Sequence, residues 1–203
     1  MPFNLNNFRS RMVGDGARPN LFEVTIKKPP IAIAEVPEES KFLIKSAQLP
    51  GSTIGTVPVF YFGRELKFAG NRTFPEWTVT VINDENFKVR NYFEKWMNSI
   101  NSHAGNVREA NILNQQNDYV GDLTVQQYSK NTILGISGVI KTYNFVDAFP
   151  TDISAIDLDW GSNDTIEEFT VTFAYQWWES RISTDSESDT TEGSSGTTTN
   201  PIR

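Results

Sequence analysis

The sequence predicts a mainly β protein, an antiparallel β-sandwich or barrel with one flanking α-helix at about residues 84–100. Two observations predict the strands. Apolar and polar residues alternate through Trp77–Ile82 and again through Phe169–Trp177, and this two-residue period is typical of strands that bury one face. The third observation is that only one segment has a helical period. Many short strands with a single helix are typical of sandwiches and barrels.

The first half of the chain predicts an arm and five β segments. Residues 1–19 are polar, and we expect an extended arm that leads into the first strand. Residues 29–40 contain three prolines, and because proline cannot donate a ladder hydrogen bond, we expect a surface excursion there. The β segments are expected at Asn20–Lys28, Lys41–Leu49, Ile54–Phe62, Glu65–Ala69 and Trp77–Ile82. The turn Gly63-Arg64 joins the third and fourth of these segments into a hairpin.

The single helix is predicted from the spacing of its apolar residues. They recur at i, i+4, i+7, i+8 and i+11, and they are Val89, Phe93, Trp96, Met97 and Ile100. Polar residues occupy the positions between them, so the helix is amphipathic and packs one face on the core. Asn83 or Asp84 is the expected N-cap residue, because both side chains can accept a hydrogen bond from the first turn.

The second half of the chain predicts a loop, two further β segments and a final strand. Residues 101–118 are polar and predict a loop, and residues 147–164 predict a long connection. The β segments are expected at Val120–Ser129, Ile133–Phe145 and Phe169–Trp177. The domain organisation is therefore an arm at 1–19, one β domain at 20–180, and a tail at 181–203. The tail is rich in Ser, Thr, Gly and acidic residues, which bury too little apolar surface to fold.

The overall charge argues against tight binding to nucleic acid. The chain has 18 Lys and Arg against 25 Asp and Glu, a net charge of −7, whereas proteins that hold DNA neutralise phosphates with a basic surface. There is no cysteine, which excludes disulfides and thiolate metal sites. No apolar run approaches the roughly 20 residues that span a bilayer, and the N-terminus lacks a signal-peptide core. We expect a soluble intracellular protein without a membrane anchor.

The residues that carry chemistry in enzymes do not form a recognisable site in the sequence. His103 is the one histidine and lies in a polar segment, where we expect a surface side chain. Glu167 and Glu168 are adjacent, so they point to opposite faces of a strand and do not form a catalytic carboxylate pair. No phosphate-binding, nucleophile-elbow or zinc motif is present. We therefore expect no enzyme activity and no cofactor.

A second acidic group lies in the connection before the last strand. Its members are Asp157, Asp159, Asn163 and Asp164. Their spacing is not that of a calcium-binding EF-hand loop. We expect these side chains to cap the backbone of a turn.

Three stretches taken together resemble one known family. They are GARPNLFEV at 16–24, FAGNRTFPEWTVTVINDENF at 68–87 and LDWGSNDTIEEFTVTFAYQWWES at 158–180. In order and spacing they resemble the tail tube proteins of T4-like contractile-tailed bacteriophages, over roughly residues 10–180. The segments at 29–40, 101–118 and 181–203 depart from the family pattern, so no role is carried over to them.

The resemblance implies a structural role in a virion. Members of this family are β-sandwich or barrel subunits that form hexameric rings, and the rings stack into a tube inside a contractile sheath. The implied partners are other copies of the chain, the sheath protein, the tape-measure protein, and the baseplate and tail-terminator proteins. The implied location is the phage tail after assembly in the host cytoplasm, with DNA passing through the lumen without specific binding.

The candidate inter-subunit residues lie in the motifs of the resemblance. They are Arg18, Asn20, Arg72, Phe74 and Trp160. An arginine and an aromatic residue at the mouth of a strand can dock a neighbouring loop with directional hydrogen bonds and a packed anchor. An ion pair within the chain for Arg72, and a place in the core for Phe74, remain open as alternatives.

The candidate lumen residues follow from electrostatics. A basic channel would hold DNA by releasing counterions, so a tube that lets DNA pass needs an acidic or neutral polar lumen. We expect residues 41–69 and 119–145 to line it, with Glu65 and Asp122 facing inward. The lysines of these segments are expected to point elsewhere or to be offset, and they are Lys41, Lys45, Lys67, Lys130 and Lys141.

Two other functions are compatible with the same fold class. A paralogous baseplate tube initiator or a secretion-system tube protein would have the same subunit. A carbohydrate-binding β-sandwich would use exposed tryptophans, but Trp77, Trp96 and Trp177 are all expected on apolar faces.

Overall fold

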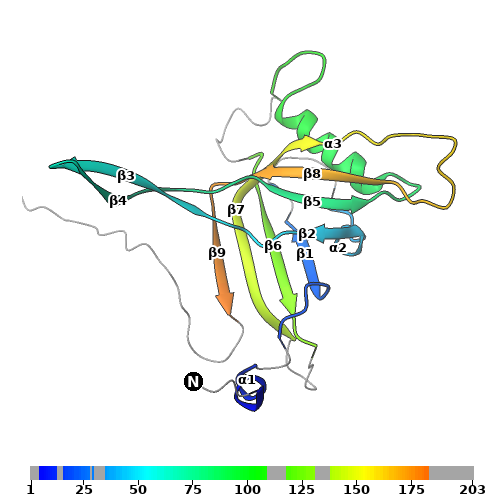
Figure 1. Ribbon diagram of the computed structural model, residues 1–203. Helices are drawn as coiled ribbons and strands as arrows, with labels where there is room; N and C mark the ends of the chain where they lie inside the picture. Colours follow the sequence, from blue (N-terminus) through cyan, green and yellow to red (C-terminus); the bar gives the residue numbers. More distant parts are fainter. Residues whose placement is uncertain are drawn as a thin grey trace, which may run out of the picture.

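A computed structural model describes residues 5–12, 16–27, 29, 35–108, 118–130 and 138–182 (Figure 1). Within them the chain is mainly β and antiparallel, with a flanking helix, as the sequence predicts. The order is α1 Leu5–Arg11, β1 Phe22–Ile26, α2 Ser40–Leu43, β2 Ile44–Ala47, β3 Thr53–Tyr61, β4 Arg64–Thr73, β5 Trp77–Ile82, α3 Lys88–Ile100, β6 Gly121–Tyr128, β7 Val139–Ile153, β8 Glu168–Ala174 and β9 Trp177–Ile182. The main sheet runs β1-β6-β7-β8-β5-β2, β9 also pairs with β7, and β3-β4 form a separate hairpin.

Strand β7 belongs to two sheets at once. Its first half, from Lys141 to Val146, pairs with β9 on one side and with β6 on the other. Its second half, from Phe149 onward, pairs with β8. Asp147 lies between the halves with a left-handed φ of 54°, and such a residue lets a strand change direction. The bend divides the fold into one sheet, β1-β6-β7-β9, and a second, β7-β8-β5-β2 (Figure 1).

The core lies between helix α3 and the two sheets. Trp96 and Phe93 on α3 are completely buried, and their rings lie 6.4 and 5.8 Å from the ring of Phe173 on β8. Trp77 on β5 lies 4.5 Å from Phe145 on β7, and its indole donates to the carbonyl of Gln48 at 2.6 Å. The alternating residues that predicted β5 and β8 are therefore the core residues that the helix covers.

The start of α3 differs from the expected N-cap. The helix begins at Lys88, four residues after Asp84, and its cap residue Phe87 has a left-handed φ of 52° and makes no side-chain cap bond. The carboxylate of Asp84 still accepts a hydrogen bond from the amide of Lys88 at 3.1 Å. The amphipathic period predicted the helix correctly. The predicted N-cap residue Asp84 lies one turn too early, because residues 84–87 precede the first helical residue.

Three expected boundaries are wrong. The segment at Lys41–Leu49 starts as the short helix α2 and becomes extended only at Ile44. The connection expected from residue 147 begins later, because β7 continues to Ile153. Trp177 begins the new strand β9 and does not end β8, and it is 43% exposed, so its assignment to an apolar face is also wrong.

The expected arm, excursion, loop and tail are described only in part. The arm contains the helix α1, which buries none of its residues. Strand β9 continues two residues past the expected domain boundary at residue 180. Residues 30–34, 109–117 and 183–203 lie outside the described residues, as does Gly135.

The aromatic core under α3 generates the first prediction. Phe93→Ala removes a fully buried ring, so it should lower the free energy of unfolding by about 3–5 kcal/mol in urea titrations of the unassembled chain. Phe42→Ala is the matched control, because Phe42 is 85% exposed and the same change there should cost less than about 0.5 kcal/mol. Equal losses for the two variants would contradict this description of the core.

The end of β9 generates the second prediction. Deleting residues 183–203 should leave the melting temperature unchanged, whereas deleting residues 177–203 should lower it clearly. The longer deletion removes the partner of β7 and also Trp178, whose indole donates to the carbonyl of Gly51 at 3.0 Å and lies 5.7 Å from Tyr143. Thermal unfolding followed by circular dichroism compares the two, and a large loss from the shorter deletion would place structural contacts in the tail.

Candidate assembly surfaces

The β3-β4 hairpin projects from the body with almost every residue exposed (Figure 1). Within the part of the chain that the structure describes, its two strands pair with each other and with no other strand. An isolated two-stranded hairpin is at best marginally stable in water, because it lacks a third strand or a covering layer. The hairpin predicted from the sequence is thus present, and it needs a surface to pack against.

The register divides the hairpin into an apolar and a mixed face. Val57 pairs with Phe68, and Val59 pairs with Leu66, so these four side chains share one face. Each is between 45% and 57% exposed. We call this set, Val57, Val59, Leu66 and Phe68, the hairpin apolar face.

The other face of the hairpin carries the charged pair. Pro58 pairs with Lys67, and Phe60 pairs with Glu65. Because Glu65 and Lys67 are two residues apart on one strand, their side chains point to the same side. Lys67 therefore does not point away from Glu65, and the two charges offset one another on this face.

The tip of the hairpin holds an aromatic residue in a conformation that favours glycine. Phe62 has φ of 46° and Gly63 has φ of 76°, as in a type I′ turn. The ring of Phe62 is 91% exposed and lies edge-on to Tyr61 with centroids 4.5 Å apart. Asparagine or glycine is the usual residue at this position, so Phe62 is not explained by the stability of the turn.

Arg72 and Phe74 lie at the root of the hairpin. Arg72 is exposed and pairs with Ile54, beyond a bulge. No ion pair of Arg72 is found within the described residues, which removes the main alternative for this side chain there. Phe74 is half-buried, with its ring 6.1 Å from that of Tyr175, so the packing alternative holds in part. Gly70 approaches the carbonyl of Gly55 so closely that a Cβ would lie 3.0 Å from it.

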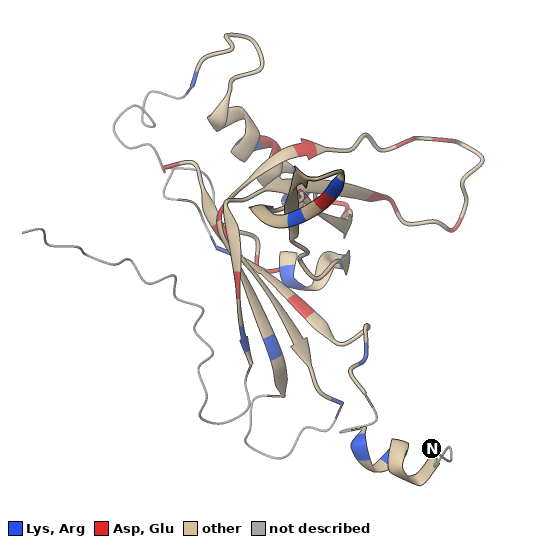
Figure 2. Cartoon of the chain, turned by 60° about the vertical axis from the view of Figure 1, so that its left-hand side comes forward, with Lys and Arg blue, Asp and Glu red and all other residues tan. Residues whose placement is uncertain are grey.

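The outer face of the β1-β6-β7-β9 sheet is polar. The register places nine polar side chains on this face, and they are Glu23, Thr25, Asp122, Thr124, Gln126, Thr142, Asn144, Glu179 and Arg181. The apolar residues Val146 and Trp177 lie on the same side at one end. The opposite face carries buried residues such as Val24, Leu123 and Phe145. We call this surface the polar sheet face, and Figure 2 shows how sparsely charged these strands are.

Charges on the polar sheet face are partly neutralised. Asp122 lies 3.5 Å from the Nζ of Lys27, and both side chains are about half exposed, so the pair contributes little to stability. Lys141 lies on the opposite side of β7, with its Nζ 5.1 Å from the centre of the Tyr143 ring. Lys45 is paired with Glu168. Two of the lysines that were expected to point away from a lumen thus have partners elsewhere.

Both outer strands of this sheet have an unpaired edge. Among the described residues, β1 pairs only with β6, and β9 pairs only with β7. An open edge presents backbone donors and acceptors that can pair with another chain. The edges lie at the two sides of the polar sheet face.

The remaining candidates are not brought together by the fold. Arg18 and Asn20 are exposed just before β1, and the carbonyl of Arg18 accepts hydrogen bonds from Leu21 and Gln127. Trp160 is fully exposed in the connection before β8. This connection and β9 lie on opposite sides in Figure 1, so Trp160 and Trp177 do not form one sugar-binding platform.

The acidic connection and the histidine are explained by local hydrogen bonds. The carboxylate of Asp159 accepts from the amide of Gly161 at 3.0 Å, as expected for a capped turn. His103 is exposed, and its ring nitrogen lies 2.8 Å from the side-chain oxygen of Asn98. Glu167 accepts from Asn83 at 2.9 Å. Within the described residues, no three His, Asp or Glu side chains are grouped so as to hold a metal ion.

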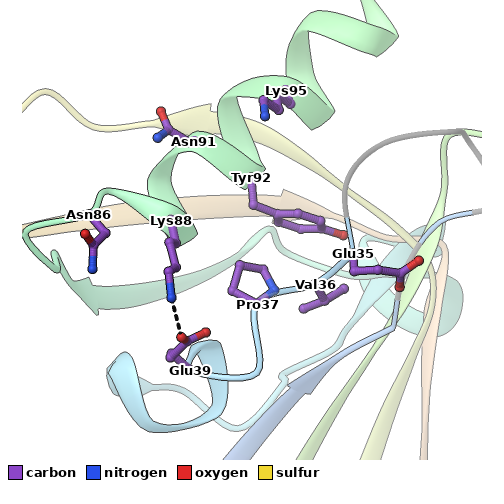
Figure 3. A pocket seen from close by; sticks show the side chains of 9 residues that line it. All are labelled: Glu35, Val36, Pro37, Glu39, Asn86, Lys88, Asn91, Tyr92 and Lys95. Atoms are coloured by element: carbon purple, nitrogen blue, oxygen red, sulfur yellow. Dashed lines mark hydrogen bonds and ion pairs between the residues drawn. The ribbon is translucent and has the colours of Figure 1, made fainter.

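A surface pocket of about 370 Å³ lies between α3 and the segment before α2 (Figure 3). Lys88 and Glu39 form an ion pair of 2.7 Å at its rim, and this hydrogen bond lowers the pKa of Glu39 and raises that of Lys88. Tyr92 is buried in its wall without a hydrogen-bond partner among the described residues for its hydroxyl, and burial raises the pKa of this phenol. No nucleophile and base are paired in this pocket, so we assign it no reaction.

The described helices include none that is long and apolar enough to cross a membrane.

A comparison with protein families gives a match over most of the chain. The family model of phage tail tube proteins matches residues 17–181. The chain belongs to the phage tail tube protein family.

Individual tail tube proteins are similar along almost their whole length. The tail tube protein gp19 of Enterobacteria phage T4 is 34% identical over 166 residues, which cover 82% of this chain and 93% of that protein. The tail tube protein of Serratia phage KSP90 is 29% identical over 174 residues, or 84% of this chain and 93% of that protein. The resemblance seen in the sequence motifs is thus confirmed.

Solved structures share the fold of this tail tube protein at low identity. A chain of the sheath-tube complex of the extracellular contractile injection system PVC, in its extended state, has a TM-score of 0.55 at 16% identity and covers 89% of this chain and 99% of that chain. A chain of the anti-feeding prophage cap has a TM-score of 0.57 at 18% identity, with 82% and 91% covered.

Sequence reasoning missed three features that the tail tube protein fold presents. The hairpin apolar face was readable as alternation at Val57, Val59, Leu66 and Phe68. The polar sheet face could be predicted from β6, where polar residues alternate with the buried ones. The edge strand β9 had no such signal, because Trp177 and Trp178 are adjacent apolar residues that break the two-residue period.

The strained tip of the hairpin generates the third prediction. Phe62→Asn should slow amide hydrogen exchange across residues 53–73 of the unassembled chain, because asparagine adopts a positive φ at lower cost than phenylalanine. Phe60→Asn is the control, since it removes the same ring from an extended residue of β3 and should not slow exchange. Equal exchange in both variants would show that φ at Phe62 is not a source of strain.

Proposed function

We propose that the chain is the subunit of the tail tube of a contractile-tailed phage, and that six copies form a ring that stacks into a tube. The supporting observation is the pair of unpaired edges, β1 and β9, at the two sides of the polar sheet face. Because neighbouring strands alternate in direction through β1, β6, β7 and β9, β9 of one copy can meet β1 of the next in the antiparallel sense. Ring closure then removes both edges, as in a continuous barrel.

The polar sheet face is proposed as the wall of the lumen. It carries three carboxylates against one guanidinium and the ammonium of Lys27. The other side chains are uncharged Thr, Gln and Asn, with Val146 and Trp177 at one end. Duplex DNA would therefore find no net basic surface to hold it. Asp122 lies on this face. Glu65, on the mixed face of the hairpin, is proposed to face the lumen at the junction between rings, with Lys67 offsetting its charge.

The hairpin is proposed to pack against a copy in the next ring. The hairpin apolar face is exposed in the single chain, and a contiguous apolar surface of this kind marks an interaction site. Arg72 at its root would bind a carbonyl or carboxylate of the neighbour, with Phe74 supporting the strand behind it. Arg18, Asn20 and Trp160 are the further proposed contact residues between copies.

The proposed partners follow from this assembly. The sheath protein would surround the tube, the tape-measure protein would occupy its lumen, and baseplate and terminator proteins would contact its ends. The tube would be assembled in the host cytoplasm and retained in the virion tail. The proposed role is structural, with no catalytic step and no cofactor.

The exposed hairpin generates the fourth prediction, which tests this function. Val59→Asp places a charge on the hairpin apolar face and should abolish ring stacking, because burying an unpaired carboxylate is costly. The unassembled variant should keep the melting temperature of the wild type, since Val59 is 46% exposed and is not among the core residues of the described chain.

Thr56→Asp is the matched control for this prediction. It introduces the same charge on the same strand but on the opposite face, and it should still give tubes in negative-stain microscopy and fast sedimentation. Wild-type protein that remains a monomer at high concentration, even with a baseplate nucleus, would refute the proposed function.

A further inference from the structure

Helix α1 presents an apolar stripe that no part of the described chain covers. Leu5 and Phe8 on the helix and Met12 directly after its end are 57%, 58% and 43% exposed. Their spacing of three and four residues places them on one side of the helix and its continuation. The helix has seven residues, none of which is buried. A helix of about two turns is not stable by itself in water. Some other surface must therefore stabilise it.

The hairpin apolar face is also an exposed apolar surface without a covering element among the described residues. A two-stranded sheet is stable only with a third strand or with a helix packed on one of its faces. Helices commonly cover a sheet in this way, with their apolar stripe against the sheet. The dimensions agree as well. From Leu5 to Met12 an α-helix rises about 10 Å, and from Val57 to Tyr61 a strand extends about 14 Å.

Within one copy these two surfaces cannot meet. In Figure 1, α1 lies below the foot of the sheet, whereas the hairpin leaves the upper part of the body and its tip points away from α1. A contact between them therefore joins two copies head to tail, and such heterologous contacts generate a stack that can grow without limit.

We infer that α1 of one copy packs its stripe of Leu5, Phe8 and Met12 on the hairpin apolar face of a copy in the adjacent ring. This inference rests on the proposed tube function and identifies the segment that covers the hairpin. In each copy the helix docks on one neighbour along the tube, and the hairpin receives the helix of the neighbour on the other side. Both elements become ordered parts of the wall only on stacking.

Engineered cysteine pairs test this contact directly, because the chain contains no cysteine of its own. Phe8→Cys combined with Val57→Cys, and separately Leu5→Cys combined with Val59→Cys, should give tubes whose subunits join into covalent chains under mild oxidation. These appear as a ladder on a non-reducing gel, and a disulfide peptide identified by mass spectrometry names the pair.

Two control pairs separate this contact from random collisions. Ser10→Cys with Val57→Cys moves the thiol to the other side of α1, and Phe8→Cys with Thr56→Cys moves it to the mixed face of the hairpin. Both should cross-link far less than the test pairs. Tubes in which test and control pairs react equally, or not at all, would overturn the inference while leaving the proposed function intact.

A second measurement decides the matter where the cysteine variants do not assemble. Hydrogen exchange on wild-type tubes should show protection of residues 5–11 together with residues 53–73, relative to the unassembled chain. Protection of the hairpin without α1 would mean that another segment or another protein covers it, which overturns the inference. Wild-type chains that never assemble would overturn the proposed function and this inference with it.

Discussion

The whole arrangement depends on strand β7 being long enough to serve two sheets. Its second half pairs with β8 and so belongs to the sheet that α3 covers, whereas its first half pairs with β6 and β9. The sheet that α3 covers is therefore joined to the β1-β6-β7-β9 sheet through the continuous backbone of β7 and not through a flexible loop. The left-handed residue Asp147 sets the bend between them. Changing the bend would tilt the polar sheet face and both of its edges together.

This division separates the part that makes the subunit stable from the parts that assemble. Trp96, Phe93 and Phe173 pack around α3, and burial of such large rings supplies most of the stability of a domain. The hairpin and α1 bury almost nothing in the single chain. Segments with few buried contacts open readily, so they can adjust to a neighbour before they become fixed, without endangering the core.

The sequence predicted the core well because alternation reports burial directly. Trp77, Val79 and Val81 on β5 are buried as their spacing requires, and the period of α3 places Phe93 and Trp96 against the sheet. Alternation does not show whether an apolar face is buried within its own chain or against another molecule. Val57 and Val59 alternate like core residues and are nevertheless exposed, a pattern that the proposed packing of the hairpin on another copy would explain.

Other features left no readable signal in the sequence. Strand β9 follows β8 after only two residues, and the turn between them is held by a hydrogen bond from the amide of Gln176 to the carbonyl of Val146, a contact between segments 30 residues apart. The sequence also left open whether Lys67 points away from Glu65 or offsets its charge. Strand geometry puts both side chains on one face, so the charge of Lys67 offsets that of Glu65.

The net charge of −7 is compatible with assembly because of where the charged residues lie in the fold. Like-charged subunits repel, yet exposed charges farther apart than the Debye length of about 8 Å interact weakly at physiological salt. The four residues of the hairpin apolar face and the stripe on α1 are uncharged, and Arg64 near the tip is the charged neighbour of Leu66 on the same side of the hairpin. Contacts between copies through these surfaces bring little charge together, so burial of apolar area is opposed only by weak, screened repulsion. If the polar sheet face lines the lumen as proposed, its carboxylates outnumber its basic groups, and such a surface would not hold the phosphates of passing DNA.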